Sequence, residues 1–378
     1  MRSLYGKLNV GIILMLLLLA VQAKAVSCVE DLFHIPEAEL NSLIAEIRVE
    51  WKNRSLSQEV LDFKVAKIPG TAVDADINYG GFKYKVISHK IDGDNDGLKN
   101  DLHYGLIRYP RDFVADGTLY PVLIMSHGGT GGVSPDFVIE FDGRMPDSYI
   151  ADNFFVVLPS FRGEKVYAES LFAAIGYDDV IFTSGGQKSV LNYDVDDAMT
   201  LLKGVLQKIP GVDKARIASY GSSRGGSVAL LLEERSRLID RTVDMYGGTD
   251  MFLLESAGIS YGCDGIPVDN PVAKNVIEPA VDAYLLEGDL EKGRKILLQS
   301  SAVYFLRSIG TLQIHHGDSD DVVDVSHSYR LADAIDEYIT GGGTPVPNYE
   351  LWIYPGGEHS VESLDGHEER VRDFIGEL

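Results

Sequence analysis

From Pro121 onward, short apolar runs alternate with longer amphipathic segments. The apolar runs cover residues 122–125, 154–158, 216–220 and 311–314. Helical segments such as residues 195–209 separate them. Apolar runs this short, bounded by turns and helices, are typical of strands buried on both faces of a parallel sheet. The pattern predicts an α/β fold with a mostly parallel central sheet and helices on both faces.

The N-terminal third has a different pattern. Apolar residues recur every three or four positions over residues 28–51, which predicts an amphipathic helix. Residues 82–87 and 102–107 read as two strands around an acidic loop. We therefore expect a small extension over residues 26–118, built from a helix and a β-hairpin, before a main domain over residues 119–378.

One part of the main domain interrupts the alternation of strands and helices. Residues 250–301 contain no strong strand pattern. In sheets of this kind such an insertion usually consists of helices that overhang the carboxyl edge of the sheet. We expect a helical cap insertion there.

The first residues have the features of an export signal. Arg2 and Lys7 precede an apolar run over residues 10–21, and Ala23-Lys24-Ala25 follows it. The run is shorter than the roughly 18 residues that cross a bilayer, and the small residues suit signal peptidase. We expect a signal peptide over residues 1–25, a secreted or periplasmic product and no membrane span after cleavage. An uncleaved membrane anchor is the alternative.

Two cysteines leave further alternatives open. Residues 25–28 are similar to a lipoprotein processing box, which would make Cys28 a lipidated N-terminus, although the expected leucine is missing. The other cysteine is Cys263. The two could pair in an oxidising compartment, or Cys263 could be a small buried thiol.

The charge of the chain excludes some classes of partner. Acids outnumber lysine and arginine by 57 to 34, a net charge of −23, and removal of residues 1–25 makes it −26. So negative a surface repels nucleic-acid phosphates and anionic lipid. We expect no nucleic-acid partner.

A glycine-serine motif carries the first candidate chemistry. Gly221-Ser222-Ser223-Arg224-Gly225 follows the apolar run at residues 216–220 and precedes the helical run at residues 228–232. By itself such a cluster is usually an ordinary turn. Between a strand and a helix, G-x-S-x-G predicts a nucleophile elbow, and the spacing selects Ser223. Its place at a helix N-terminus favours a developing oxyanion.

A serine nucleophile needs a base and an acid that orients the base. After a nucleophile elbow the acid comes next in the chain and the histidine last. Asp320 follows the apolar run at residues 311–314, and His359 follows the strand pattern at residues 350–354. Either residue alone would more often be a surface group. Together, in this order and at the carboxyl edge of the sheet, they predict a catalytic triad with Ser223.

Backbone donors for an oxyanion come from a glycine-rich loop. Residues 126–132 follow the apolar run at residues 122–125. We expect the N–H groups of Gly128, Gly129 and Arg224 to form an oxyanion hole. The alternatives are a flexible loop or a phosphate cradle, but the G-K-[ST] ending of a phosphate loop is absent.

Taken together, these motifs resemble the prolyl oligopeptidase-like branch of the α/β-hydrolases, which includes acylaminoacyl-peptidase-like enzymes and related esterases. The matching segments are residues 127–129, 161–163, 196–198, 210–217, 221–226, 316–323 and 354–359. The resemblance implies an α/β-hydrolase fold, Ser223 as nucleophile, His359 as general base and Asp320 as orienting acid. The H-G-x-x-D spacing selects Asp320 from an acidic cluster that also holds Asp318, Asp321 and Asp324.

One departure from the resembled branch bears on function. Its peptidases usually carry a large β-propeller before the hydrolase domain, and residues 26–118 are too few to build one. We therefore expect an exported serine hydrolase that cleaves an acyl ester, or an amide, through an acyl-enzyme and without a cofactor. Its expected substrate is a small-molecule ester or a short peptide. The alternatives are an aminopeptidase or oligopeptidase of the prolyl oligopeptidase family, or a non-catalytic hydrolase-like binding protein.

The acidic loop over residues 92–101 suggests a second site. Asp92, Asp94 and Asp96 place carboxylates at alternate positions, and Gly97 is the sixth residue, as in a calcium loop. His103 stands where such a loop has its final glutamate, so the loop is not an EF-hand. The alternatives are a structural calcium site and a plain acidic hairpin turn.

Overall fold

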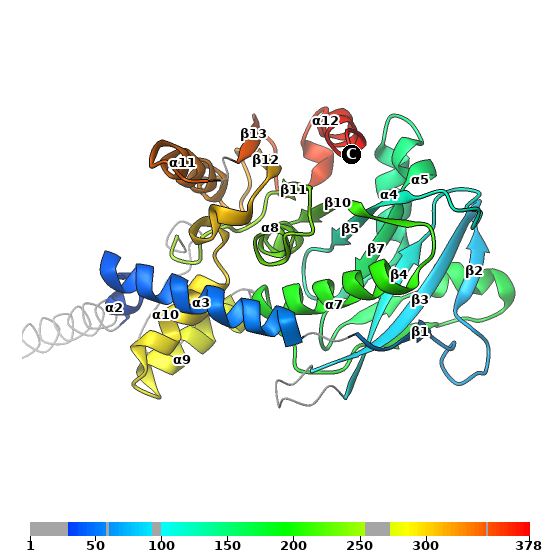
Figure 1. Ribbon diagram of the computed structural model, residues 1–378, viewed down its shortest axis with the longest axis horizontal. Coiled ribbons are helices and arrows are strands. Elements are labelled where there is room, and N and C mark those ends of the chain that lie inside the picture. Colours follow the sequence, from blue (N-terminus) through cyan, green and yellow to red (C-terminus); the bar gives the residue numbers. More distant parts are fainter. Residues whose placement is uncertain (1–28, 58–59, 93–99, 254–272, 345–346) are drawn as a thin grey trace, which may run out of the picture.

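A computed structural model describes residues 29–57, 60–92, 100–253, 273–344 and 347–378. These residues form a ten-stranded sheet in the order β1-β3-β4-β7-β5-β10-β11-β12-β13, with β2 paired to β3 (Figure 1). The strands are β1 (Leu61–Val65), β2 (Asp76–Tyr79), β3 (Phe82–Ile91), β4 (Asp101–Arg108), β5 (Tyr120–Ser126), β7 (Phe155–Pro159), β10 (Val212–Ser222), β11 (Arg241–Met245), β12 (Thr311–Gly317) and β13 (Asn348–Tyr354). From β7 to β13 all neighbours are parallel, which confirms the predicted parallel sheet.

Helices cover both faces of this sheet, as the apolar pattern predicts. On one face, α3 (Glu37–Ser57), α7 (Asn192–Lys208), α8 (Arg224–Ser236) and α11 (Ser326–Thr340) share one hydrophobic core. On the other face, α4 (Pro135–Arg144), α5 (Tyr149–Asn153), α6 (Glu169–Phe172) and α12 (His367–Gly376) share a second core. A small sheet of β6 (Gly132–Val133), β8 (Lys165–Tyr167) and β9 (Ile181–Thr183) is also present among the described residues.

The segment at residues 26–118 contributes strands to the same sheet as the rest of the chain. β4 pairs antiparallel with β7, from Gly105 opposite Pro159 to Arg108 opposite Val156. The expected boundary near residue 118 therefore falls within one continuous sheet. The helix predicted over residues 28–51 is divided into α2 (Glu30–Phe33) and α3, with Pro36 in the break, where its ring removes a backbone donor and restricts the residue before it.

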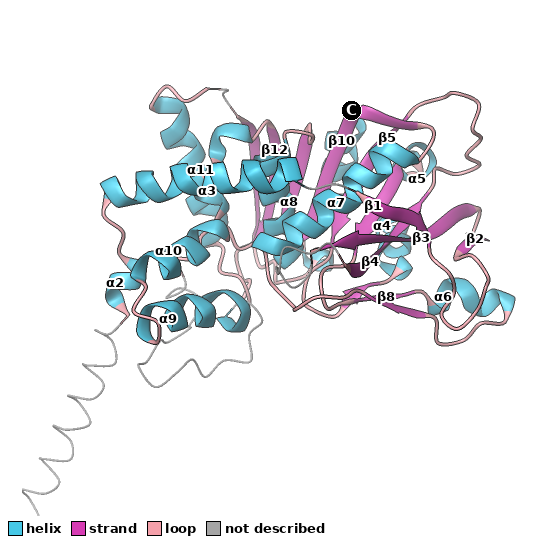
Figure 2. Cartoon of the chain, turned by 60° about the horizontal axis from the view of Figure 1, so that its bottom comes forward, coloured by secondary structure: helices cyan, strands magenta, loops and turns pink. Residues whose placement is uncertain are grey.

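The helices of the expected cap pack against the N-terminal helices. α10 (Leu290–Gln299) lies beside α2 and α3, and α9 (Glu278–Leu285) packs against α10 (Figure 2). Arg294 of α10 donates hydrogen bonds to the carbonyl oxygens of Asp31 (2.5 Å) and His34 (2.6 Å). Residues 254–272 lie outside the described residues, so the position of the cap over the sheet edge stays a prediction.

Some sequence predictions fall outside the residues that the structure describes. They concern the signal peptide at residues 1–25, the cysteines Cys28 and Cys263, and two carboxylates of the acidic loop, Asp94 and Asp96. Within the described ranges, no helix combines the length and apolar character needed to cross a membrane.

Candidate active site

Ser223 occupies a tight turn between β10 and α8. Its backbone has φ 57° and ψ −126°, a conformation that is strained for a residue with a side chain. The flanking glycines allow the turn, because a Cβ on Gly221 would lie 2.0 Å from the Gly225 carbonyl oxygen, and one on Gly225 would lie 2.0 Å from the Ser126 carbonyl oxygen. The turn thus presents the Ser223 side chain beyond the end of the strand.

The structure brings together the three residues that the motif order selects. The Nε2 atom of His359 lies 2.9 Å from the Ser223 hydroxyl oxygen. Its Nδ1 atom lies 2.7 Å from Oδ2 of Asp320. The loops that carry Asp320 and His359 follow the neighbouring strands β12 and β13 at one edge of the sheet. They approach each other closely because Gly317 has no Cβ: one would lie 2.1 Å from the Gly357 carbonyl oxygen.

Asp320 is held as a carboxylate by the donors around it. Burial alone would raise its pKa, but hydrogen bonds from His316 and His359 and from the N–H groups of Val322 and Val323 hold the pKa well below its usual range. Both backbone N–H groups donate to Oδ1 at 2.9 Å, which leaves Oδ2 to face His359. The charged carboxylate can therefore orient the imidazole and stabilise an imidazolium.

The other acids of this cluster have different contacts. Asp318 accepts a hydrogen bond from the Gly356 N–H at 2.6 Å, and Asp324 accepts one from the Ser326 N–H at 2.9 Å. Asp318 thus ties the β12 loop to the loop that carries His359. The contact to the His359 ring belongs to Asp320, the acid that the H-G-x-x-D spacing selects.

The glycine-rich loop lies directly against Ser223. A Cβ on Gly128 would lie 3.0 Å from the Ser222 carbonyl oxygen and 3.2 Å from the Ser223 Cβ. Gly129 has φ 62°, which favours glycine. Arg224 is the first residue of α8, where backbone N–H groups lack an intrahelical acceptor. The three residues predicted as the oxyanion hole thus border the same space beside Ser223.

A buried ionic network that the sequence analysis missed supports this loop. The Arg224 guanidinium donates to Asp194 (2.8 Å), to Glu164 (2.6 Å) and to the Gly129 carbonyl oxygen (2.6 Å). The Arg224 side chain is only 3% exposed, and those of Glu164 and Asp194 are buried more completely. The arginine therefore joins α8 to the glycine-rich loop.

Glu164 connects this arginine to His127. One carboxylate oxygen accepts from Arg224, and the other lies 3.2 Å from Nε2 of His127, whose ring stacks on Phe161 at 4.7 Å. Burial would raise the pKa of Glu164, but His127 and Arg224 outweigh it and lower the pKa. The only hint in the sequence was the Phe161-Arg162-Gly163 motif, which directly precedes Glu164.

The metal prediction stays open. The described residues contain no group of three or more His, Cys, Asp or Glu side chains that could hold a metal ion. Asp92 is described and follows β3, but Asp94 and Asp96 are not described. A calcium ion in this loop remains a prediction that depends on residues outside the described ranges.

Comparisons with known proteins identify the architecture. No protein-family model matches the chain, and no curated protein matches it by sequence. Among solved structures, acetyl xylan esterase 1 from Thermoanaerobacterium sp. JW/SL YS485 is 15% identical, with a TM-score of 0.56 over 91% of this chain and 98% of that one. The acetyl xylan esterase from Paenibacillus sp. R4 is 16% identical, with a TM-score of 0.56 over 91% and 100%.

A peptidase shares the same architecture over a smaller part of its length. The puromycin-hydrolyzing peptidase of Mycobacterium tuberculosis is 16% identical, with a TM-score of 0.52 over 81% of this chain and 48% of that one. At these identities the likeness concerns the fold. It confirms an α/β-hydrolase fold, shared with these two esterases and this peptidase.

Proposed function

We propose that this α/β-hydrolase-fold chain is an exported serine hydrolase that cleaves acyl esters through an acyl-enzyme. One observation carries the proposal: the hydrogen-bonded chain from Ser223 through His359 to Asp320, with lengths of 2.9 Å and 2.7 Å. A hydrolase-like binding protein would need none of these three groups, and it would not need a nucleophile held in a strained turn.

The first half of the reaction forms the acyl-enzyme. The Ser223 oxygen attacks the acyl carbonyl carbon while His359 Nε2 takes the hydroxyl proton, and Asp320 stabilises the resulting imidazolium. The carbonyl oxygen gains negative charge, which the N–H groups of Gly128 or Gly129 and of Arg224 stabilise. When the tetrahedral intermediate collapses, the alkoxide leaves and takes the proton from His359. The acyl group is then esterified to Ser223.

The second half regenerates the enzyme with the same groups. Water attacks the acyl carbon while His359 takes one of its protons. Collapse of the second intermediate breaks the bond to Ser223, which recovers the proton from His359. The carboxylic acid leaves, so one ester and one water yield one alcohol and one acid. The cycle needs no cofactor.

The extent of the structural likeness favours esters over peptides. Residues of this chain cover 98% and 100% of the two acetyl xylan esterases but only 48% of the M. tuberculosis peptidase. The likeness thus extends over nearly the whole of each esterase and over about half of the peptidase. We propose acetyl esters of carbohydrate hydroxyl groups as the substrate class. Aminoacyl amides are the alternative.

Export is the second part of the proposal. It rests on the charged, apolar and small-residue pattern of residues 1–25. The place of action would be outside the cytoplasm, either secreted or periplasmic, where soluble acetylated glycans are accessible. Mass determination of the N-terminus of the exported protein tests the expected cleavage after Ala25, and a lipidated Cys28 would instead support the lipoprotein alternative.

A fluorophosphonate probe and a substrate panel test the activity. The probe should label Ser223 in the wild type and fail to label Ser223→Ala. The panel compares 4-nitrophenyl acetate, butyrate and octanoate, acetylated xylan, and aminoacyl 4-nitroanilides. We expect the acetyl ester to be hydrolysed fastest and acetate to be released from the glycan. An unlabelled wild type would refute the serine mechanism, and faster anilide hydrolysis would refute the esterase assignment.

A further inference from the structure

A pocket of about 440 Å³ lies between α3, the C-terminal end of α8 and the short helix η5 (Leu306–Ser308). Five cationic side chains line it: Arg48, Lys52, Arg235, Arg237 and Arg307. Such a concentration is unexpected, because acids outnumber bases by 57 to 34 in this chain. α8 begins beside Ser223 and runs 13 residues to this pocket, about 20 Å away at 1.5 Å per residue. The pocket is therefore separate from the triad.

Most of these cations have no acidic partner. Arg235 pairs with Asp196. Within the described ranges, the other four cations form no ion pair with a carboxylate. The one carboxyl group in the wall belongs to Glu234, and neither of its oxygens has a hydrogen-bond partner in the described part of the chain. Burial and the neighbouring Glu233 raise the pKa of Glu234 well above its usual range. One carboxyl group thus stands against five cationic groups in the wall of this pocket.

The cationic groups are packed against two aromatic rings. Trp51 and Phe305 lie 4.3 Å apart, centroid to centroid. The Arg48 guanidinium lies over Phe305 at 5.7 Å, and that of Arg235 lies over Trp51 at 5.0 Å. Burial and the nearby charge of Arg307 both lower the pKa of Arg48, so these two guanidinium groups repel each other. An anion between them would remove that repulsion.

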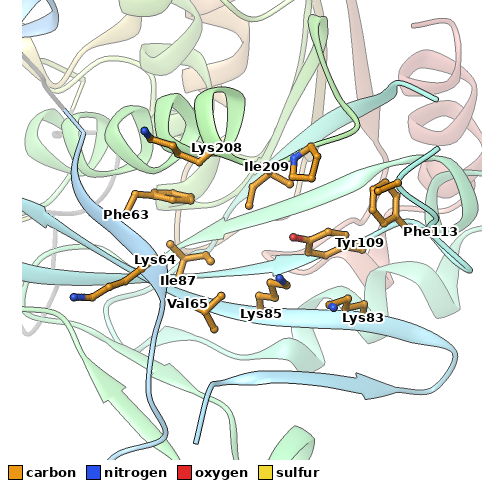
Figure 3. A pocket seen from close by; sticks show the side chains of 12 residues that line it. Phe63, Lys64, Val65, Lys83, Lys85, Ile87, Tyr109, Phe113, Lys208 and Ile209 are labelled. Atoms are coloured by element: carbon orange, nitrogen blue, oxygen red, sulfur yellow. The ribbon is translucent and has the colours of Figure 1, made fainter. Parts of the chain in front are cut away.

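A second basic pocket offers a contrast (Figure 3). Lys64, Lys83, Lys85 and Lys208 line it, but Lys83 and Lys85 both pair with Asp76, at 3.3 Å and 3.2 Å. Figure 3 shows the ammonium groups of Lys64 and Lys208 pointing away from the centre of the pocket. This pocket has no convergent set of cations.

We infer that the arginine-lined pocket binds a tetrahedral oxyanion, the phosphate or sulfate group of a small ligand. Guanidinium groups bind such oxyanions through paired, directional hydrogen bonds. The cationic residues belong to α3, to the end of α8 and to η5. The three or four oxygens of a tetrahedral ion point in different directions and suit such an arrangement better than the two coplanar oxygens of a carboxylate. The volume exceeds that of a bare ion, so an esterified phosphate or sulfate fits.

Calorimetry and thermal unfolding of the full chain test this inference. Sodium phosphate, sulfate and acetate are compared at constant ionic strength maintained with sodium chloride. We expect phosphate or sulfate to raise the Tm by several degrees, because an ion that binds only the folded state stabilises it. Acetate should have little effect. The ion that binds more tightly, phosphate or sulfate, indicates which of these two groups the natural ligand carries.

Two double variants that remove equal charge separate a site from general attraction. Arg237→Ala/Arg307→Ala changes two exposed arginines of the pocket and should weaken binding about 10-fold or more. Lys64→Ala/Lys208→Ala changes two exposed lysines of the other pocket and should leave the Kd within about twofold of the wild type. The single variant Arg307→Gln provides the same comparison if the arginine pair lowers the yield of folded protein.

Three results would overturn the inference. They are no effect of either tetrahedral ion on the wild type, an equal effect of acetate, or an equal loss of binding in the arginine and lysine variants. Hydrolysis of 4-nitrophenyl acetate by the same variants should be unchanged, since none of these residues contacts the triad. The outcome is therefore independent of whether the proposed esterase function holds.

Discussion

Replacement of Glu164 by glutamine tests whether the buried network positions the oxyanion loop. The carboxylate accepts from Arg224 at 2.6 Å and lies 3.2 Å from His127, and the side chains of all three residues are at most 6% exposed. Glutamine preserves the shape but carries no charge, so Arg224 loses one of its two buried carboxylate partners. Arg224 keeps its bond to Asp194 at 2.8 Å.

The expected loss of stability follows from these contacts. A buried hydrogen bond to a charged group contributes about 1.5–3 kcal/mol, so we expect Glu164→Gln to lower the free energy of unfolding by about 2–3 kcal/mol at pH 7. The folded-state pKa of Glu164 is lowered, so its stabilisation is present above the pKa of an unfolded glutamate and is lost as the pH falls. The difference in the free energy of unfolding between wild type and variant should therefore shrink below about pH 4.

Activity provides the decisive measurement. Arg224 holds the Gly129 carbonyl oxygen, so a loosened guanidinium would shift the loop that carries the oxyanion donors. We expect kcat for 4-nitrophenyl acetate to fall about 10- to 100-fold with little change in KM, because the loop acts on the transition state. Urea unfolding followed by the fluorescence of Trp51 and Trp352 gives the stability.

A matched control is Glu287→Gln, which removes an exposed ion pair with Lys292 far from the site in sequence. This substitution should measurably change neither the free energy of unfolding nor kcat. If Glu164→Gln loses stability as expected but keeps a kcat within about twofold of the wild type, the network supports only the fold and the positioning argument fails.

Other changes test the triad, a buried acid and the acidic loop. Ser223→Ala should lower kcat about 10³-fold or more without changing the Tm. Activity in this variant would mean that Ser223 is not the nucleophile and that the G-x-S-x-G motif was aligned wrongly. Asp320→Asn should lower kcat strongly, whereas Asp324→Asn should have a small effect; the reverse would disprove the choice of acid. Burial raises the pKa of Asp244 to about 7, so its contribution to wild-type stability should be lost as the pH rises from about 4 to about 7. Asp244→Asn should flatten that urea-unfolding profile, and a flat wild-type profile would contradict the burial argument. If the acidic loop over residues 92–101 binds calcium, a chelator should lower the Tm of the wild type but not that of Asp94→Ala. An unchanged wild-type Tm would mean that this loop is a plain acidic turn.

The sequence determined the fold class and the three residues of the candidate triad. Apolar runs such as residues 216–220 reveal buried parallel strands because burial on both faces requires continuous apolar character. The G-x-S-x-G spacing selects Ser223 because only glycine fits two residues before and after the turn, where a Cβ would meet backbone atoms at 2.0 Å. Asp320 and His359 follow from their order after strands that end at one edge.

β11 shows what the apolar pattern missed. Arg241 and Asp244 interrupt its apolar character, so the five-residue segment has no clear run of its own. It becomes a strand because β10 and β12 hydrogen-bond to it on both sides. The antiparallel strands before residue 118 likewise belong to the main sheet through the long-range pairing of β4 with β7.

The support behind the oxyanion loop was decided by tertiary structure alone. Arg224 reaches Asp194 and Glu164, which lie 30 and 60 residues away in the chain. No local spacing connects such residues, because their contact depends on how α7, the β7–β8 loop and the nucleophile turn pack together. The sequence determined which groups can react, since local backbone geometry and chain order place them. Packing decided which charges hold those groups in position, since buried charges must find partners wherever the fold brings them.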